Sequence, residues 1–103
     1  MMYSNVDAII MAWIDLHSFK LFRAFGGQER RFFYLSNSRQ ECFQISIEPP
    51  QNGVVIVNAW SVETVNDEEL HHEWTVPIED LRNALDAALA KVTEWMTRLN
   101  VTY

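Results

Sequence analysis

Two helical segments on either side of a β-rich middle predict an α+β fold, a five-stranded antiparallel meander flanked by an N-terminal and a long C-terminal helix. Three observations support this fold class. Apolar residues recur at spacings of three and four near both ends of the chain, they alternate with polar residues in between, and short turn sequences separate the alternating runs. A length of 103 residues suits one core, so residues 1–103 are assigned to a single domain.

The first helix is expected over residues 4–17. Ser4 is a candidate N-cap, and Asp7 follows three residues later as in a capping box. We expect Trp13 to face the core together with the rest of one helical stripe, which consists of Val6, Ile9, Ile10, Trp13 and Leu16.

Five strands are expected in the middle of the chain, over residues 19–25, 30–36, 41–48, 54–64 and 70–76. Glycine, proline, asparagine and acidic residues form the short connections between them, at 26–27, 37–38, 49–53 and 66–69. Short connections favour antiparallel neighbours, so the strands should pair in the order of the sequence.

The last helix is expected from about residue 78 to about residue 99, directly after Pro77. Its apolar positions follow the spacing 3, 4, 3, 4, 3, 4 without a break, and this stripe is Ile78, Leu81, Leu85, Ala88, Val92, Trp95 and Leu99. We expect the stripe to pack on the sheet of the same domain rather than to form a coiled coil.

Several strands are apolar on both faces. In the fourth strand, Ile56, Trp60 and Val62 point away from Val55, Val57 and Ala59. The first two strands carry the apolar residues Phe19, Leu21, Phe25, Phe33 and Leu35, joined on alternating positions by Phe22, Phe32 and Tyr34. If both helices cover one face, the other must curl into a partial barrel or be covered by a partner.

Charge is distributed unevenly along the chain, whose net charge is −6. Residues 41–80 contain nine acidic side chains and neither Lys nor Arg. Nearby arginines can neutralise only part of this charge, so a negative surface patch is predicted. The residues expected to bind a partner there are Trp60, Glu63, Asp67, Glu68, Glu69, His71 and Glu73.

No catalytic residue, metal site or cofactor is predicted. Cys42 lies mid-strand, without the strand-to-helix elbow or glycine-rich turn of a nucleophile, and is interpreted as a structural thiol. Glu69, His71 and Glu73 alternate on one strand face, but no second cluster supplies a fourth metal ligand. The acidic residues are spread along turns and outward positions with no lysine among them, which argues against a magnesium-dependent nuclease.

Nucleic-acid binding is disfavoured as well. Basic and aromatic residues do interleave around two early strands, as they do on surfaces that bind single-stranded nucleic acid. These residues are Arg23, Arg30, Arg31, Phe32, Tyr34 and Arg39. The chain is acidic overall, however, and phosphate affinity needs positive potential. We expect these arginines to pair with acidic strands of the same domain.

The chain has one cysteine, no basic-then-apolar leader and no run of 18 apolar residues. These features predict a cytoplasmic protein that does not cross a membrane. A small, acidic, tryptophan-rich α+β domain of this kind resembles the immunity proteins that neutralise bacterial polymorphic and contact-dependent toxins. The resemblance implies a non-enzymatic domain that binds a basic protein partner.

Other functions remain open at this stage. The chain also resembles small acidic secretion chaperones, although those usually place a helix in mid-sheet. The second apolar sheet face could instead form a homodimer, and a pocket between helix and sheet could serve a small ligand or an enzyme.

Overall fold

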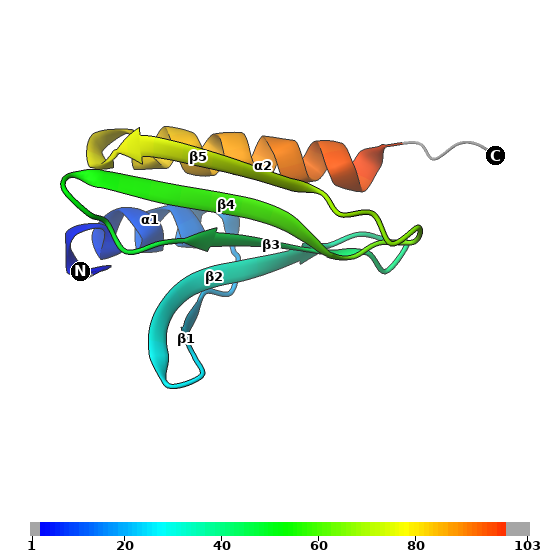
Figure 1. Cartoon of the computed structure of the whole chain (residues 1–103), viewed down its shortest axis with the longest axis horizontal. Coiled ribbons are helices and arrows are strands. Elements are labelled where there is room, and N and C mark those ends of the chain that lie inside the picture. Colours follow the sequence, from blue (N-terminus) through cyan, green and yellow to red (C-terminus); the bar gives the residue numbers. More distant parts are fainter. Residues whose placement is uncertain (1–2, 99–103) are drawn as a thin grey trace.

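The computed structural model describes residues 3–98 and confirms the α+β fold with its antiparallel meander (Figure 1). Five strands pair in sequence order in one sheet, with a helix before them and a long helix after them. The elements are η1 (Tyr3–Asn5), α1 (Asp7–His17), β1 (Phe22–Phe25), β2 (Gln28–Ser36), β3 (Cys42–Ile47), β4 (Val54–Glu63), β5 (His71–Pro77), η2 (Ile78–Asp80) and α2 (Leu81–Thr97).

Both helices pack on the same face of the sheet. Ile10, Trp13 and Ile14 of α1 are buried in one core with the apolar side of α2 and the inner side of the strands. The strand residues of this core are Phe33, Leu35, Phe43, Ile45, Ile47, Val55, Val57 and Ala59. The alternation seen in the sequence therefore assigns the inner face of β3 and β4 correctly.

The start of α1 differs from the prediction. Ser4 is not the N-cap, because Tyr3–Asn5 form a 3-10 turn and Val6 occupies the cap position without a side-chain hydrogen bond. Tertiary contacts hold this turn instead: Val6 is fully buried, and the Tyr3 hydroxyl donates to the Ile47 carbonyl at 2.8 Å. At the other end, Leu16 is 65% exposed and Ile14 lies in the core in its place.

The last helix begins slightly later than predicted, since residues 78–80 form a 3-10 turn and Pro77 still belongs to β5. The core stripe is confirmed at Leu81, Leu85, Ala88 and Val92, which are all fully buried. Trp95 is half-buried and stacks on Phe43, with ring centroids 5.9 Å apart. Leu99 lies outside the residues that the structure describes.

The opposite face of the sheet carries no helix of the described chain, and the sheet curls around it. Figure 1 shows β2 strongly bent and the β1–β2 hairpin turned away from the helices. Strand β1 is shorter than predicted, and a bulge between Phe22 and Ala24 shifts its register with β2. The shift places Phe25 opposite Gln28, so its ring packs against Phe32 on the open face, whereas simple alternation grouped Phe25 with the core-side residues.

Candidate functional site

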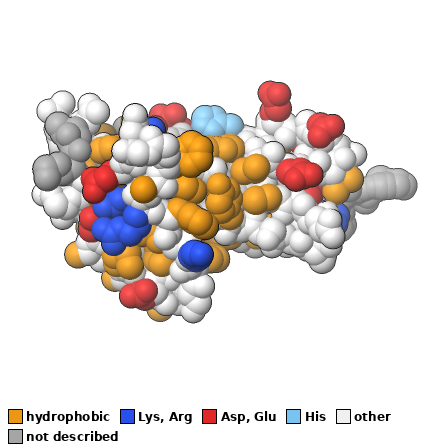
Figure 2. All heavy atoms as spheres, turned by 90° about the horizontal axis from the view of Figure 1, so that it is seen from below, with side chains coloured by type: hydrophobic (Ala, Val, Ile, Leu, Met, Phe, Trp, Pro, Cys, Tyr) orange, Lys and Arg blue, Asp and Glu red, His pale blue; other side chains and the backbone are white. Residues whose placement is uncertain are grey.

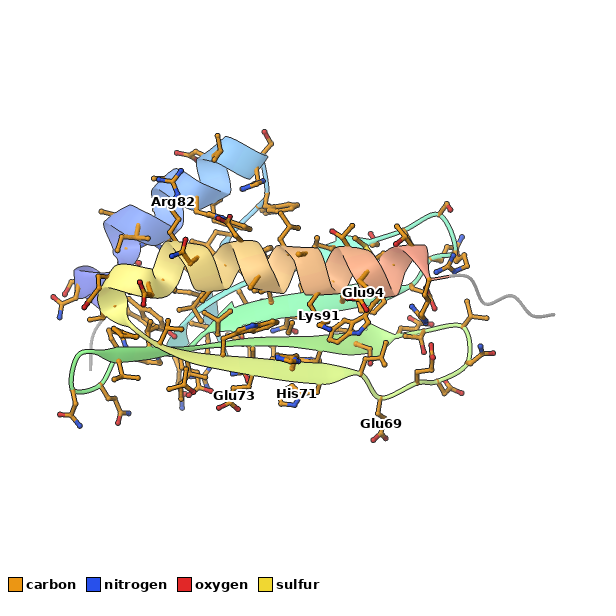
Figure 3. All side chains as sticks on the ribbon, turned by 90° about the horizontal axis from the view of Figure 1, so that it is seen from above. Glu69, His71, Glu73, Arg82, Lys91 and Glu94 are labelled. Atoms are coloured by element: carbon orange, nitrogen blue, oxygen red, sulfur yellow. The ribbon has the colours of Figure 1, made fainter. Side chains whose placement is uncertain are left out.

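The predicted partner-binding residues come together at one end of the open face. Six of the seven line a shallow groove of about 610 Å³, formed by the end of β4, the β4–β5 turn and the start of β5. These six are Trp60, Glu63, Asp67, Glu68, Glu69 and His71, and we call this feature the acidic groove. Glu73 lies beyond it on β5, opposite Asn58. In Figure 3, Glu69, His71 and Glu73 all point away from α2.

Local hydrogen bonds fix the shape of the β4–β5 turn. The Glu68 N–H donates to the Thr64 hydroxyl, and the Ser61 hydroxyl bridges the Glu68 carbonyl and the Leu70 N–H. Asp67 has a left-handed backbone with φ of 53°, a conformation that Asp tolerates better than most residues. With the backbone held in this way, the acidic side chains of the turn are left on the surface.

One acidic residue of the 41–80 stretch belongs to the interior. Glu41 is fully buried between the β2–β3 turn, the β4–β5 turn and the end of α2. Its carboxylate accepts hydrogen bonds from the Asn37 amide, the Arg39 and Arg98 guanidinium groups and the Val65 N–H. Burial alone would raise the pKa of Glu41, but these hydrogen bonds and the nearby Arg98 charge lower it to about 2.

Arg98 also pairs with Glu68 and donates to the Trp95 carbonyl. Glu68 is therefore partly neutralised, which the sequence prediction did not foresee, because Arg98 is thirty residues away in the chain. The same cation ties the end of α2 to the β4–β5 turn. The acidic groove thus lies next to an ion-pair cluster in which the buried Glu41 carboxylate contacts the partly exposed Arg39 and Arg98.

Four acidic residues remain exposed at the groove and beside it: Glu63, Asp67, Glu69 and Glu73. Within residues 3–98, the ion pairs involve other carboxylates, namely Asp7, Glu29, Glu41, Glu68 and Glu94. We call these four the exposed acidic set. Their charges are not compensated by a neighbouring cation in this part of the chain, so they give the groove a negative potential.

Trp60 and His71 lie beside each other on neighbouring strands and link the groove to the centre of the open face. Trp60 is half-buried, so part of its ring remains accessible. His71 Nε2 lies 3.2 Å from Asn58 Oδ1, while Asn58 Nδ2 donates to Glu48 at 2.9 Å. Because the amide oxygen of Asn58 must accept, Nε2 is the protonated nitrogen of His71.

A second hollow, of about 550 Å³, adjoins the groove and shares Trp60 with it. Aromatic side chains of the β1–β2 hairpin form one wall. Phe32 stacks on Phe22 at 5.2 Å and meets Tyr34 and Phe25 edge-to-face at 5.7 and 6.5 Å. We call this feature the aromatic hollow. In Figure 2, hydrophobic side chains cluster in the middle of the open face, and acidic side chains lie toward both ends, next to Lys or Arg side chains at one of them.

The early arginines do not form the basic strand pair that the sequence suggested. Arg31 is only 2% exposed, makes two hydrogen bonds to the Asp7 carboxylate and lies over the Tyr3 ring. Arg23 also approaches Asp7, and Arg39 belongs to the Glu41 cluster. Only Arg39 therefore pairs with the acidic stretch as expected, while Arg23 and Arg31 anchor α1 through Asp7.

The side chains that could bind a metal ion or act as a nucleophile do not form a site. In the region from Tyr3 to Arg98, no three His, Cys, Asp or Glu side chains are close enough to share a metal ion. Cys42 is half-buried, and burial together with the Glu63 charge raises the pKa of its thiol. A raised pKa disfavours the reactive thiolate.

Helices long and apolar enough to span a membrane are not found among residues 3–98. Comparison with known proteins adds no relative: no protein-family model, no curated protein and no solved structure matches this chain. The groove, the hollow and the charges around them are the features of this chain that bear on its function.

Proposed function

We propose that this chain is a non-enzymatic protein-binding domain whose acidic groove binds a basic protein partner. The observation that carries the proposal is the exposed acidic set (Glu63, Asp67, Glu69 and Glu73) gathered around one half-buried tryptophan. Uncompensated like charges cost stability, so a surface that retains them is best explained by a partner that supplies the opposite charge.

The structure of the groove suits recognition of a protein surface. It is shallow and open, its backbone is held by Ser61 and Thr64, and it is supported by the buried Glu41 cluster. A preorganised acidic surface speeds association with a basic partner and limits the entropy lost on binding. Trp60 would serve as the aromatic anchor that interfaces commonly use.

Toxin neutralisation is the most concrete form of this function. It is supported by the resemblance to immunity proteins, since toxins that act on nucleic acids are often basic. This form predicts a large toxin gene directly upstream of the gene for this chain. Co-expression of the chain should then protect cells from the toxin domain, and unprotected cells would contradict the toxin form while leaving a different basic partner open.

The binding of a basic partner can be tested with a defined probe, a short fluorescein-labelled peptide rich in lysine. A groove variant neutralises the exposed acidic set through Glu63→Gln, Asp67→Asn, Glu69→Gln and Glu73→Gln. Glu68 is left unchanged because it pairs with Arg98. A control variant removes the same number of charges from exposed positions off the open face, through Asp15→Asn, Glu79→Gln, Asp80→Asn and Glu94→Gln, and within residues 3–98 only Glu94 of these four has an ion-pair partner, Lys91.

Stopped-flow anisotropy at low and physiological salt measures the association rate. Screening acts over about 8 Å at physiological salt, so the local groove charges should matter more than the distant ones. We expect the groove variant to associate several-fold more slowly than the control variant and to show a weaker dependence on salt. Equal rates and salt slopes for the two variants would overturn the proposal.

A further inference from the structure

The acidic groove and the aromatic hollow adjoin each other at Trp60. Among residues 3–98, Trp60 alone lines both. On one side of it lie Phe25, Phe32 and Tyr34, and on the other lie Glu63 and the β4–β5 turn. A ligand that contacts Trp60 can therefore reach an apolar surface and an acidic surface at once.

The hollow offers accessible aromatic surface. Phe25 is 70% exposed and Tyr34 is 43% exposed, and Val62, outside the hollow on β4, is 51% exposed. Phe32 beneath Phe25 is 7% exposed, so the hollow has a packed floor. Contiguous apolar surface of this kind, bordered by polar residues, is typical of interaction sites. A bulky apolar side chain placed there would cover ring faces that water now contacts.

The spacing of the two features along β4 limits the shape of the ligand. A bulge lies between Trp60 and Glu63 at the end of β4, because these two residues face Gln44 and Cys42, which are only two residues apart on β3. Their separation along the strand therefore corresponds to about 7 Å. An extended segment of a partner advances by the same distance per residue. The hollow lies on the other side of Trp60 from Glu63, so a side chain in the hollow and a cation in the groove would be further apart than this, by three or four residues of the partner.

We propose that the hollow and the groove form one site for an extended segment of a basic protein, in which an aromatic or large aliphatic side chain enters the hollow and a Lys or Arg three or four residues away lies in the groove. This inference rests on the proposed function and specifies its partner. It adds an apolar anchor to a recognition that charge alone would leave unspecific.

A second copy of this chain is a poorer occupant of the site. Each chain carries a net charge of −6, so two copies repel one another. Two cations near the hollow, Arg31 and Arg23, already pair with Asp7, and the lining that contains Arg30 also contains Glu48. Charge complementarity therefore favours a basic partner over self-association.

The test uses three labelled peptides of equal length and the intact chain. One peptide carries a tryptophan and, from three residues later, a run of lysines. The second replaces the tryptophan by alanine, and the third replaces the lysines by glutamine. The protein variants are Phe25→Ser and Tyr34→Ser in the hollow and the groove variant described above. Leu16→Ser is the control, because it removes from α1 an apolar side chain about as exposed as Phe25. Thermal unfolding by circular dichroism confirms that each variant is folded.

For the wild-type chain, we expect replacement of the peptide tryptophan to weaken binding about 10-fold. Phe25→Ser or Tyr34→Ser should weaken the complete peptide to a similar extent, and the effects of the peptide and hollow changes should not add, since both remove the same contact. Leu16→Ser should bind as the wild type does.

The outcomes separate this inference from the proposed function. If the groove variant weakens binding but both hollow variants bind like Leu16→Ser, the anchor is wrong and the acidic groove stands. If the groove variant has no effect, both proposals fail. Failure of the wild-type chain to bind the complete peptide below about 1 mM would also overturn the inference. So would a wild-type dimer by light scattering that Phe25→Ser dissociates, since a second copy would then occupy the hollow.

Discussion

The two faces of the sheet carry similar apolar residues, but one face is buried and the other is exposed. On the face under the helices, Phe33, Phe43 and Val57 are fully buried. On the open face, Phe25, Tyr34 and Val62 are between 43% and 70% exposed. Apolar residues of the strands lie on both faces of the sheet. The faces differ because the two helices cover one of them and not the other. Apolar side chains thus stabilise the fold on one face and remain available for contact on the other.

Charge shows the same contrast at one end of the molecule. Glu41 is buried among Asn37, Arg39 and Arg98, whereas the exposed acidic set lies just beyond the β4–β5 turn. In the sequence, Glu41 and each member of the exposed acidic set contribute the same negative charge. The hydrogen bonds and ion pairs of Glu41 stabilise the folded domain, while the exposed residues repel one another.

The largest effect is expected on the covered face. Leu85 is fully buried in α2, so Leu85→Ala removes packed atoms and leaves a cavity. The free energy of unfolding, measured with urea, should fall by about 2 to 5 kcal/mol. A loss below about 0.5 kcal/mol, the usual range for surface changes, would show that this face is not the core.

The second prediction concerns acid stability. The pKa of Glu41 is lowered from 4.5 to about 2, so the stability it provides is present above pH 4.5 and is lost as the pH falls toward 2. The contribution at neutral pH is about 3 kcal/mol, from about 1.4 kcal/mol for each pKa unit. Glu41→Gln should be less stable at pH 7 by about 2 to 3 kcal/mol.

The difference between the wild type and Glu41→Gln should shrink as the pH is lowered from 5 to 3, because Glu41 then takes up a proton in the unfolded wild type while it stays ionised in the folded protein. Other carboxyls such as Asp7 titrate in both proteins and cancel in the difference. Urea unfolding across this pH range provides the measurement. A difference that stays constant with pH would show that Glu41 does not carry the acid sensitivity.

The contact between the two helices should have a smaller effect. The Trp13 indole N–H donates to Asp86 at 2.8 Å, and the rest of the ring is buried against Phe19 and Phe33. Trp13→Phe removes this hydrogen bond and part of the ring, so we expect a loss of about 1 to 2 kcal/mol. Asp86→Asn retains an acceptor and serves as the control, and an equal loss in that variant would indicate a general change in α2.

The smallest effect on stability is expected on the open face. Phe25 is 70% exposed at the tip of the β1–β2 hairpin, so Phe25→Ser should change the free energy of unfolding by less than about 0.5 kcal/mol. The same variant is expected to weaken binding of the tryptophan–lysine peptide. A loss above about 2 kcal/mol in urea unfolding would mean that Phe25 supports the fold, and the contrast between the two faces would fail.

Local periodicity was enough to predict the fold and the covered face. The unbroken stripe from Leu81 to Val92 and the alternation of Phe43, Ile45 and Ile47 depend on spacing within one element. Leu16 and Phe25 were placed wrongly for reasons that such spacing cannot reveal. The core at the end of α1 takes Ile14 instead, and a bulge reverses the side of the sheet on which Phe25 lies.

The acidic groove was predictable in part, because its residues are close together in the sequence. The stretch without Lys or Arg identified Glu63, Asp67 and Glu69 as a local concentration of charge. Glu41 and Arg98 are 57 positions apart in the sequence, so no local sequence pattern could predict that they pair. The aromatic hollow depends likewise on the curl of the sheet, which brings the β1–β2 hairpin toward Trp60.

We propose that the open face binds a partner and that the covered face stabilises the fold. Chemical-shift mapping of the ¹⁵N-labelled chain with the tryptophan–lysine peptide tests it most directly, since every backbone amide reports at once. We predict shifts concentrated in the β1–β2 hairpin around Phe25 to Tyr34 and in the segment from Trp60 to Glu73, with little change in α1 and α2. Shifts centred on the outer surface of the helices, or spread evenly over both faces, would contradict the account.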